Sequence, residues 1–130
     1  MKGLDTNVVL RLLLEDDPEQ TTRARAVVRR ESAVQKCWIN RVVLCEVVWV
    51  LESAYRYRRE QIGDAVQALL LSDDLTLEQR DVIRSALYAF RTSRADFSDC
   101  LLGMSNGLHG CERTLTFDQK AAELDEFELV

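Results

Sequence analysis

The sequence predicts an α/β fold: a single domain over residues 1–130 in which helices cover both faces of a central, mostly parallel sheet, giving three α/β/α layers. Short apolar runs typical of buried strands alternate with segments of helical period, which is the pattern of a parallel sheet covered on both sides. Several acids stand where a strand pattern gives way to a helical one. With 47% hydrophobic residues, the chain can bury one core and is too short for two domains.

The first half of the chain predicts two strands and three helices. The residues up to Asp5 are expected to form a strand that turns into a helix over Val8–Leu14. A second helix, Thr21–Arg30, is expected to bury three apolar residues and to expose its arginines as a solvated face, with a nucleic-acid site as the alternative. The three apolar residues are Ala24, Val27 and Val28. Cys37–Asn40 suits a second buried parallel strand, and an apolar helix over Val42–Leu51 follows it.

The second half predicts further helices and two more strands. Helices are expected over Glu60–Leu71, Glu78–Arg91 and Ala95–Leu108, with Leu75–Leu77 as a connector or edge segment. Arg113–Phe117 has a strand pattern that runs into Asp118. A short helix over Gln119–Leu124 and a final edge strand over Phe127–Val130 complete the chain.

The net charge of −5 argues at first against a nucleic-acid partner, but the acids are unevenly distributed. The last ten residues hold four acids and no Lys or Arg, so the other 120 residues carry 18 acids against all 17 bases. A polyanion could bind if several acids converged on metal ions with arginines around them. Tyr55–Arg59 alternates aromatic and basic residues and could stack on RNA, although a helix end with solvated arginines is the simpler interpretation.

The compartment and the cysteines can also be predicted. No apolar run approaches the ~20 residues that span a bilayer, and the residues before Asp5 are too few for a signal peptide, so a cytoplasmic protein without membrane contact is expected. The cysteines form no C-x-x-C pair and no tight metal spacing, so we expect four reduced core thiols. They are Cys37, Cys45, Cys100 and Cys111. The only histidine, His109, is expected at a helix end.

Acids at strand ends and in an apolar helix are the candidate site residues. Asp5 and Asp118 each follow a strand pattern, and the carboxyl ends of parallel strands line the crevice where ligands bind. Glu46 is the only charged residue within its helix, so we expect it to point into apolar surroundings and to need a proton, an arginine partner or a metal. Asp96 and Asp99, three residues apart, share one helix face.

Helix capping is the alternative role for most of these acids. Asp5, Thr6 or Asn7 could cap the first helix, Asp96 and Asp99 could form a capping box, and Asp118 could be an N-cap. If the acids instead converge, oxygen ligands without Cys or His select Mg²⁺ or Mn²⁺. Their mutual repulsion would raise some of their pKa values until a cation is bound.

Four segments, taken in order, resemble the signature of PIN-domain ribonucleases, and in detail and length the VapC toxins of bacterial toxin–antitoxin pairs. They are Asp5–Leu13, Glu46 in its apolar helix, Ala95–Leu102 and Thr116–Asp118. The resemblance spans the whole chain and implies four Mg²⁺ ligands, with Mn²⁺ as a substitute and Asp96 beside them as a ligand or orienting group. The implied ligands are Asp5, Glu46, Asp99 and Asp118, and the implied supporting residues are Thr6, Asn7, Ser98 and Thr116.

The resemblance also implies a function and partners. It implies a Mg²⁺-dependent endoribonuclease toxin of a type II pair that cuts transfer RNA or ribosomal RNA loops and so inhibits translation or growth. A water activated by the metal would attack phosphorus and leave a 5′ phosphate and a 3′ hydroxyl. The implied partners are a VapB-like antitoxin that lays a helix or extended peptide near the active site, a second copy of the chain, and a higher hetero-oligomer with the antitoxin.

Three alternatives remain at this point. A PIN fold with an idle site would be an RNA-binding or protein-binding module. A phospho-receiver domain has similar length and acids at strand ends, but Asp5 stands alone after the first strand and the central acid lies within a helix. Metal-dependent cleavage of DNA is the third, because the same carboxylates act on any phosphodiester.

Overall fold

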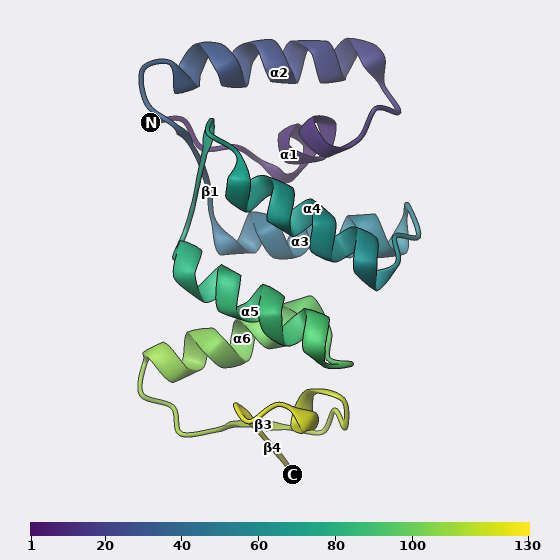
Figure 1. Cartoon of the computed structure of the whole chain (residues 1–130), viewed down its shortest axis with the longest axis vertical. Helices are drawn as coiled ribbons and strands as arrows, with labels where there is room; N and C mark the ends of the chain where they lie inside the picture. Colours follow the sequence, from purple (N-terminus) through teal and green to yellow (C-terminus); the bar gives the residue numbers. More distant parts are fainter. The chain divides into compact units, whose positions relative to one another are not determined.

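The computed structural model describes every residue from Met1 to Val130 and consists of two compact units (Figure 1). Unit 1 is Met1–Glu78 and unit 2 is Gln79–Val130. The predicted α/β class is confirmed: six α-helices accompany four strands, and the strands pair in parallel as two two-stranded sheets, one in each unit. The expectation of a single domain stays a prediction.

Unit 1 contains four helices and two strands. They are α1 (Thr6–Leu13), α2 (Pro18–Ser32), β1 (Cys37–Ile39), α3 (Arg41–Ser53), α4 (Arg59–Leu71) and β2 (Leu75–Leu77). β1 and β2 are parallel, with Cys37 beside Leu75. The expected first strand is reduced to a single bridge between Gly3 and Trp38, where the Leu4 N–H donates to the Trp38 carbonyl at 2.9 Å. Asp5 therefore does stand where an extended segment turns into a helix.

Polar side chains fix the starts of the first three helices. Asp5 accepts the Val8 N–H at 3.0 Å, Asp17 accepts the N–H of Gln20, and Asn40 accepts the N–H of Val43. Each satisfies a backbone donor that has no partner within its helix, and Pro18 at the start of α2 has no N–H to satisfy. The sequence thus specifies these helix starts locally.

An ionic network joins the end of α1, the loop after it and the end of α3. Arg11 donates from Nη1 to Asp16 Oδ1 at 2.8 Å, and the Tyr55 hydroxyl donates to Asp16 Oδ2 at 2.6 Å. Arg11 and Tyr55 also contact each other, at 3.3 Å. The Tyr55 hydroxyl bond and the Arg11 charge lower the pKa of Asp16. Tyr55 thus takes part in a polar network between the ends of α1 and α3.

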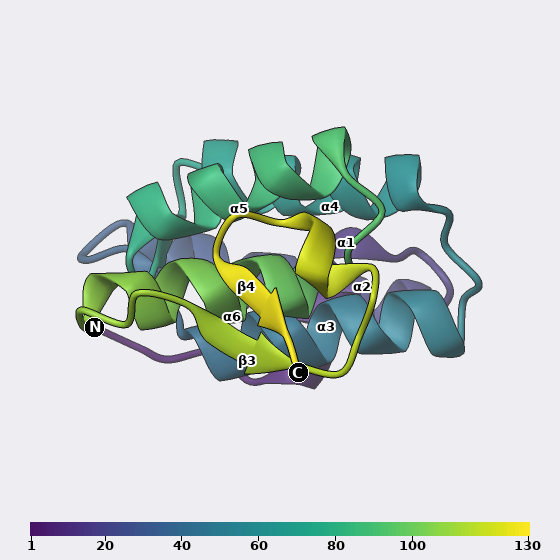
Figure 2. The same cartoon turned by 90° about the horizontal axis from the view of Figure 1, so that it is seen from below.

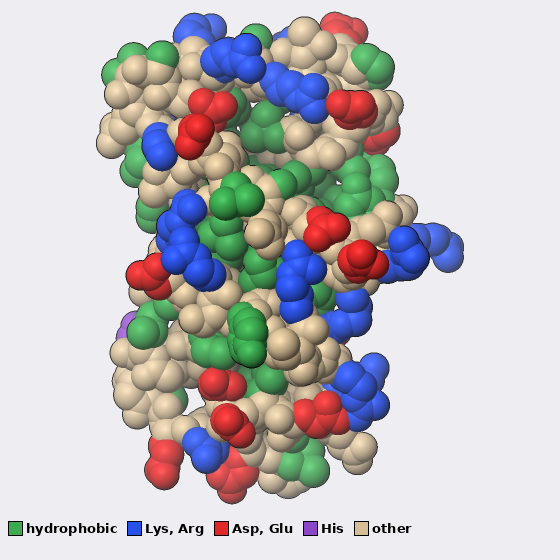
Figure 3. Space-filling view, in the orientation of Figure 1, with side chains coloured by type: hydrophobic (Ala, Val, Ile, Leu, Met, Phe, Trp, Pro, Cys, Tyr) green, Lys and Arg blue, Asp and Glu red, His purple; other side chains and the backbone are tan.

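The basic residues of α2 are partly neutralised by nearby acids. Figure 3 shows Lys and Arg side chains over α2 with acidic side chains beside them. Arg25 pairs with Glu15 at 3.2 Å, and Arg30 pairs with Glu31 at 3.0 Å. These exposed pairs are typical of a solvated helix face and contribute little to stability. The predicted inward face of α2 is wrong at Val27, which is 44% exposed, because only the Val28 side of the helix is covered.

Unit 2 is two helices followed by a small parallel sheet. Its elements are α5 (Arg80–Thr92), α6 (Phe97–Leu108), β3 (Thr114–Thr116), the 3₁₀ helix η1 (Ala121–Glu123) and β4 (Phe127–Leu129). α5 and α6 pack together, with the Phe90 and Phe97 rings edge to face at 5.9 Å between centroids. β3 and β4 lie side by side in Figure 2, with Thr114 beside Phe127. The two strands predicted for this part are confirmed.

The cysteines are all free, as expected, but not all lie in the core. Cys37 and Cys100 are buried and Cys45 is half-buried. Cys111 is exposed, so its predicted place in the core is wrong. The physical reason is the turn at Gly110, which has a φ of +85° and follows the end of α6, so the chain continues over the surface. His109 lies at that helix end, as predicted.

The helices are short relative to a bilayer. None of them is both long enough and apolar enough to cross a membrane.

Two glycines of α6 give a matched test of packing in unit 2. A Cβ on Gly103 would lie 2.6 Å from Phe127 Cε2 and 3.0 Å from Glu126 Cβ, whereas a Cβ on Gly107 would meet nothing within 4 Å. We expect Gly103→Ala to lower the free energy of unfolding by about 1–3 kcal/mol, because β4 must shift. Gly107→Ala should raise it by up to about 1 kcal/mol, because alanine favours helix. Urea unfolding measures both, and equal effects would contradict the close contact of α6 with β4.

Candidate metal and nuclease site

The five candidate acids divide between the two units. Asp5 and Glu46 belong to unit 1, at the start of α1 and within α3. Asp96, Asp99 and Asp118 belong to unit 2, at the start of α6 and after β3. Each group has its own local geometry.

In unit 1, one carboxylate oxygen of Asp5 accepts a hydrogen bond and the other does not. Oδ1 accepts the Val8 N–H at 3.0 Å, so the capping role expected as an alternative is realised. Oδ2 accepts no hydrogen bond, and the residue is exposed. The cap therefore orients the carboxylate while leaving an oxygen available to a ligand.

Glu46 is held by a hydroxyl next to Asp5 in the sequence. Thr6 Oγ1 donates to Glu46 Oε2 at 2.6 Å across the contact between α1 and α3. Because a hydroxyl donates along a defined direction, this bond orients the Glu46 carboxylate. A side-chain hydrogen bond thus joins Glu46 to the residue that follows Asp5, across a separation of 40 residues.

The expectation that Glu46 points into apolar surroundings is wrong. Glu46 is exposed, and so are its helical neighbours Val42 and Trp49, each with 67% of its surface accessible. The buried face of α3 is the opposite one, made by Leu44, Val47, Val48 and Leu51. The helix carries apolar residues on both faces, so apolar neighbours did not indicate burial.

In unit 2, Asp99 carries a carboxylate that its surroundings disfavour. Partial burial, followed by the negative charges of Asp96 and Asp118, raises its pKa. The predicted convergence of charge is therefore present within this unit. Asp96 stands at the N-cap position of α6, but its side chain accepts no capping bond, so the alternative of a capping box is not formed.

Asp118 is oriented by backbone donors. Its Oδ1 accepts the N–H of Lys120 at 2.8 Å and the N–H of Ala121 at 3.1 Å, which is the local capping role foreseen for it. Thr116 Oγ1 in turn accepts the Asp118 N–H at 3.0 Å. These bonds fix the direction of the carboxylate.

The other supporting candidates make no such contacts. Asn7 and Ser98 are both exposed, and the side chain of neither makes a hydrogen bond. Two basic residues escaped the sequence analysis: Arg94 and Lys120 line the same recess as Asp96 and Asp118. A signal was present, since each lies two positions from one of these acids in the sequence.

Comparison with known proteins decides the family. The sequence model of the PIN domain matches residues 3–127. The chain belongs to the PIN domain family. It is also 26% identical over 124 residues to a protein named VapC ribonuclease from Aquifex aeolicus (strain VF5), a match that covers 95% of this chain and 92% of that relative. The resemblance to VapC-type PIN domains is therefore confirmed, and the phospho-receiver alternative is excluded.

The donor set of this PIN domain fits a hard divalent cation. All five acids offer carboxylate oxygens, which suit Mg²⁺ or Mn²⁺, and a cation near Asp99 would favour its ionised form, which partial burial and the charges of Asp96 and Asp118 disfavour. No three His, Cys, Asp or Glu side chains lie close enough together to hold a metal ion. The type of donor atom, and not a preformed coordination site, is what favours a divalent cation.

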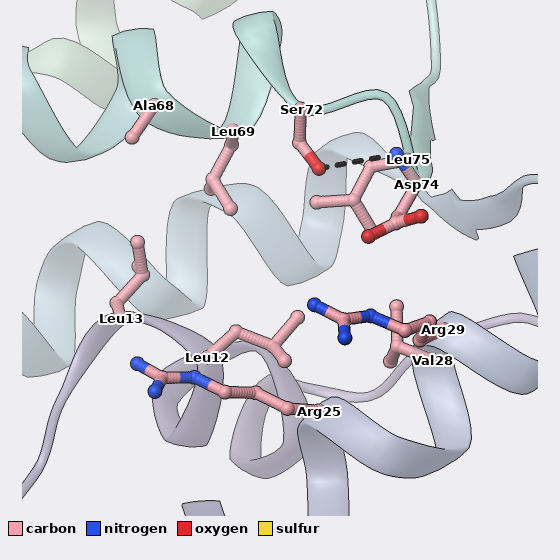
Figure 4. Close-up of a pocket in the computed structure, with 10 residues that line it drawn as sticks. All are labelled: Leu12, Leu13, Arg25, Val28, Arg29, Ala68, Leu69, Ser72, Asp74 and Leu75. Atoms are coloured by element: carbon pink, nitrogen blue, oxygen red, sulfur yellow. Dashed lines mark hydrogen bonds between the residues drawn. The ribbon is translucent and has the colours of Figure 1, made fainter.

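The PIN domain also has an apolar pocket within unit 1 (Figure 4). It measures about 280 Å³, and its lining comes from α1, α2, α4 and β2 with the residues just before that strand. Leu12 and Leu13 of α1 face Leu69 of α4 across it, with Arg25 and Arg29 of α2 on another side. The two leucines are only half-buried.

The raised pKa of Asp99 predicts that replacing this carboxylate increases the stability of the protein, by an amount that depends on pH. Because its pKa is raised in the folded protein, the folded state binds this proton more tightly than the unfolded state does. Stability is therefore lost as the pH rises past the ordinary aspartate value of about 4, and the loss is complete above the raised value. We expect Asp99→Asn to be more stable than the parent at pH 7, with a smaller difference at about pH 3.5.

Urea unfolding in EDTA measures this difference. Asp125→Asn, at an exposed acid of the same unit, is the matched control and should change stability by less than about 0.5 kcal/mol at either pH. If Asp99→Asn is no more stable than the parent at pH 7, or if the gain in stability is the same at both pH values, the raised pKa of Asp99 is contradicted.

Proposed function

We propose that this PIN domain is a divalent-cation-dependent endoribonuclease and the toxin of a type II toxin–antitoxin pair. The observation that carries the proposal is the family match over residues 3–127 in a chain that has all five acids. The similarity to a protein named VapC ribonuclease, over 95% of the chain, supports RNA as the substrate.

We assign the acids as follows. Asp5, Glu46, Asp99 and Asp118 are the proposed ligands of Mg²⁺, for which Mn²⁺ can substitute, and Asp96 is a ligand or orients one. A cation bound there would lower the pKa of a coordinated water and neutralise charge on the phosphate. The proposed supporting residues are Thr6, Asn7, Ser98 and Thr116, and the hydrogen bonds of two of them, Thr6 and Thr116, favour this assignment.

The protein's own groups have positioning roles in this chemistry. Thr6 holds one oxygen of Glu46, and the N–H groups of Lys120 and Ala121 hold one oxygen of Asp118. The only histidine, His109, contacts the Ser105 carbonyl at the end of α6, so we assign it no part in proton transfer. Hydrolysis by water would leave a 5′ phosphate and a 3′ hydroxyl, and the 2′-hydroxyl of RNA would take no part as nucleophile.

The proposed substrates are exposed loops of transfer RNA or ribosomal RNA. Single-stranded loops present phosphates and splayed bases that a protein can reach, whereas base-paired RNA hides them. Cleavage there would inhibit translation or growth.

The proposed partners are a VapB-like antitoxin, a second copy of the chain, and a larger assembly of both. The pocket of Figure 4 supports a protein partner, because leucines beside two arginines and Asp74 suit an amphipathic segment that carries charged residues. The exposed Val42 and Trp49 on one face of α3 favour a protein contact as well.

The homodimer can be tested on the antitoxin-free protein. Light scattering at micromolar concentration should give twice the chain mass of 14.9 kDa. A wild-type protein that is monomeric at these concentrations would exclude the dimer.

The nuclease is tested by cleavage of a total small-RNA pool, with the new ends mapped. We expect cutting with Mg²⁺ and none with EDTA, and we expect Asp5→Asn and Glu46→Gln to reduce the rate by at least about a hundredfold, because a lost ligand weakens binding of the cation. Asp125→Asn should cut at the parental rate.

The products and a second substrate separate the alternatives. Ends with 5′ phosphates agree with hydrolysis by water, whereas a 2′,3′-cyclic phosphate would exclude this route. Faster cleavage of matched single-stranded DNA would make the protein a deoxyribonuclease. If the folded protein binds Mn²⁺ but cuts neither polymer, the proposal fails in favour of a binding module.

A further inference from the structure

Unit 2 has a polar recess beside two of its acids. It measures about 410 Å³ and is lined by Arg94, Asp96, Asp118, Gln119 and Lys120. Two positive and two negative groups therefore face one space. The acids have assigned roles, whereas the bases have none so far.

Arg94 is already neutralised by an acid of the same unit. Its Nε and Nη2 both donate to the carboxylate of Glu123, and this pair lowers the pKa of Glu123. A bidentate pair of this kind fixes the guanidinium plane. Arg94 thus lines the recess with its charge balanced by Glu123.

Lys120 has a fixed backbone and a free ammonium group. Its N–H donates to Asp118 Oδ1 at 2.8 Å, so its Cα is held next to that carboxylate. The side chain is exposed, and its Nζ makes neither a hydrogen bond nor an ion pair. The recess therefore contains one cation that can meet a ligand, anchored beside a proposed metal ligand.

We propose that Lys120 binds a backbone phosphate of the RNA substrate in this recess, next to the phosphodiester that is cut. The inference rests on the proposed function and adds a substrate contact to it. A lysine ammonium is a compact charge that suits a phosphate oxygen, and the flexible side chain can follow the strand. The contact is to the backbone, so it contributes affinity and position but no base preference.

Neutralising nearby acids is the competing role for Lys120, since its charge contributes to the lowered pKa of Glu123. That role would affect stability, whereas phosphate binding would affect the salt dependence of RNA affinity. Each phosphate contact on single-stranded nucleic acid contributes about 0.7 to the slope of log affinity against log salt. The slope is therefore the deciding measurement.

The experiment measures RNA binding without cleavage. Asp5→Asn serves as the silenced background, and a labelled single-stranded RNA of about ten nucleotides is the probe, in Mg²⁺ buffer. We expect added Lys120→Gln to weaken binding about fivefold at 0.1 M salt and to reduce the slope by about 0.7. Lys120→Arg should retain both values, since it keeps the charge.

Lys36→Gln is the matched control, at an exposed lysine of unit 1 whose side chain has no partner. It should leave affinity and slope unchanged. An unchanged slope in Lys120→Gln, or an equal loss in Lys36→Gln, would overturn the inference. If the wild type still cuts RNA, only the Lys120 contact fails; if the wild type neither cuts nor binds RNA, the proposed function fails with it.

Discussion

The geometry of unit 1 depends on the polar side chains that start its helices. Asp5, Asp17 and Asn40 each accept a backbone N–H of the helix that follows, so each preceding segment turns into a helix at a defined residue. Because α1 begins directly after Asp5, Thr6 is its first residue and its hydroxyl reaches Glu46. A local hydrogen bond thus determines which side chain meets an acid 40 residues away.

In unit 2 the main constraint is electrostatic, because three of its acids repel one another. Asp99 is partly buried and stands near two other negative charges, which makes its ionised form unfavourable. Asp118 is compensated by two backbone N–H groups, and the Arg94–Glu123 pair supplies balanced charge nearby. A raised pKa of this origin is the behaviour expected of a functional cluster of carboxylates, and the proposed cation would relieve the repulsion.

The sequence predicted the order and type of the helices and the parallel pairing of the strands, because these follow from local periodicity and capping. It could not identify the buried face of α3, since that helix has apolar residues all round and Glu46 lies among the exposed ones. The predicted burial of Val27 and Cys111 was wrong for a similar reason, because an apolar residue is buried only where another element covers it. The bond between Thr6 and Glu46 depends on packing between α1 and α3, which periodicity does not specify.

Binding of Mn²⁺ to the purified, antitoxin-free protein tests most directly whether acids of both units hold a divalent cation. The wild type should bind Mn²⁺, and Asp5→Asn in unit 1 and Asp99→Asn in unit 2 should each weaken that binding at least about tenfold, while Asp125→Asn leaves it unchanged. Failure of the folded wild type to bind Mn²⁺, or binding that survives both substitutions at full strength, would contradict the assignment.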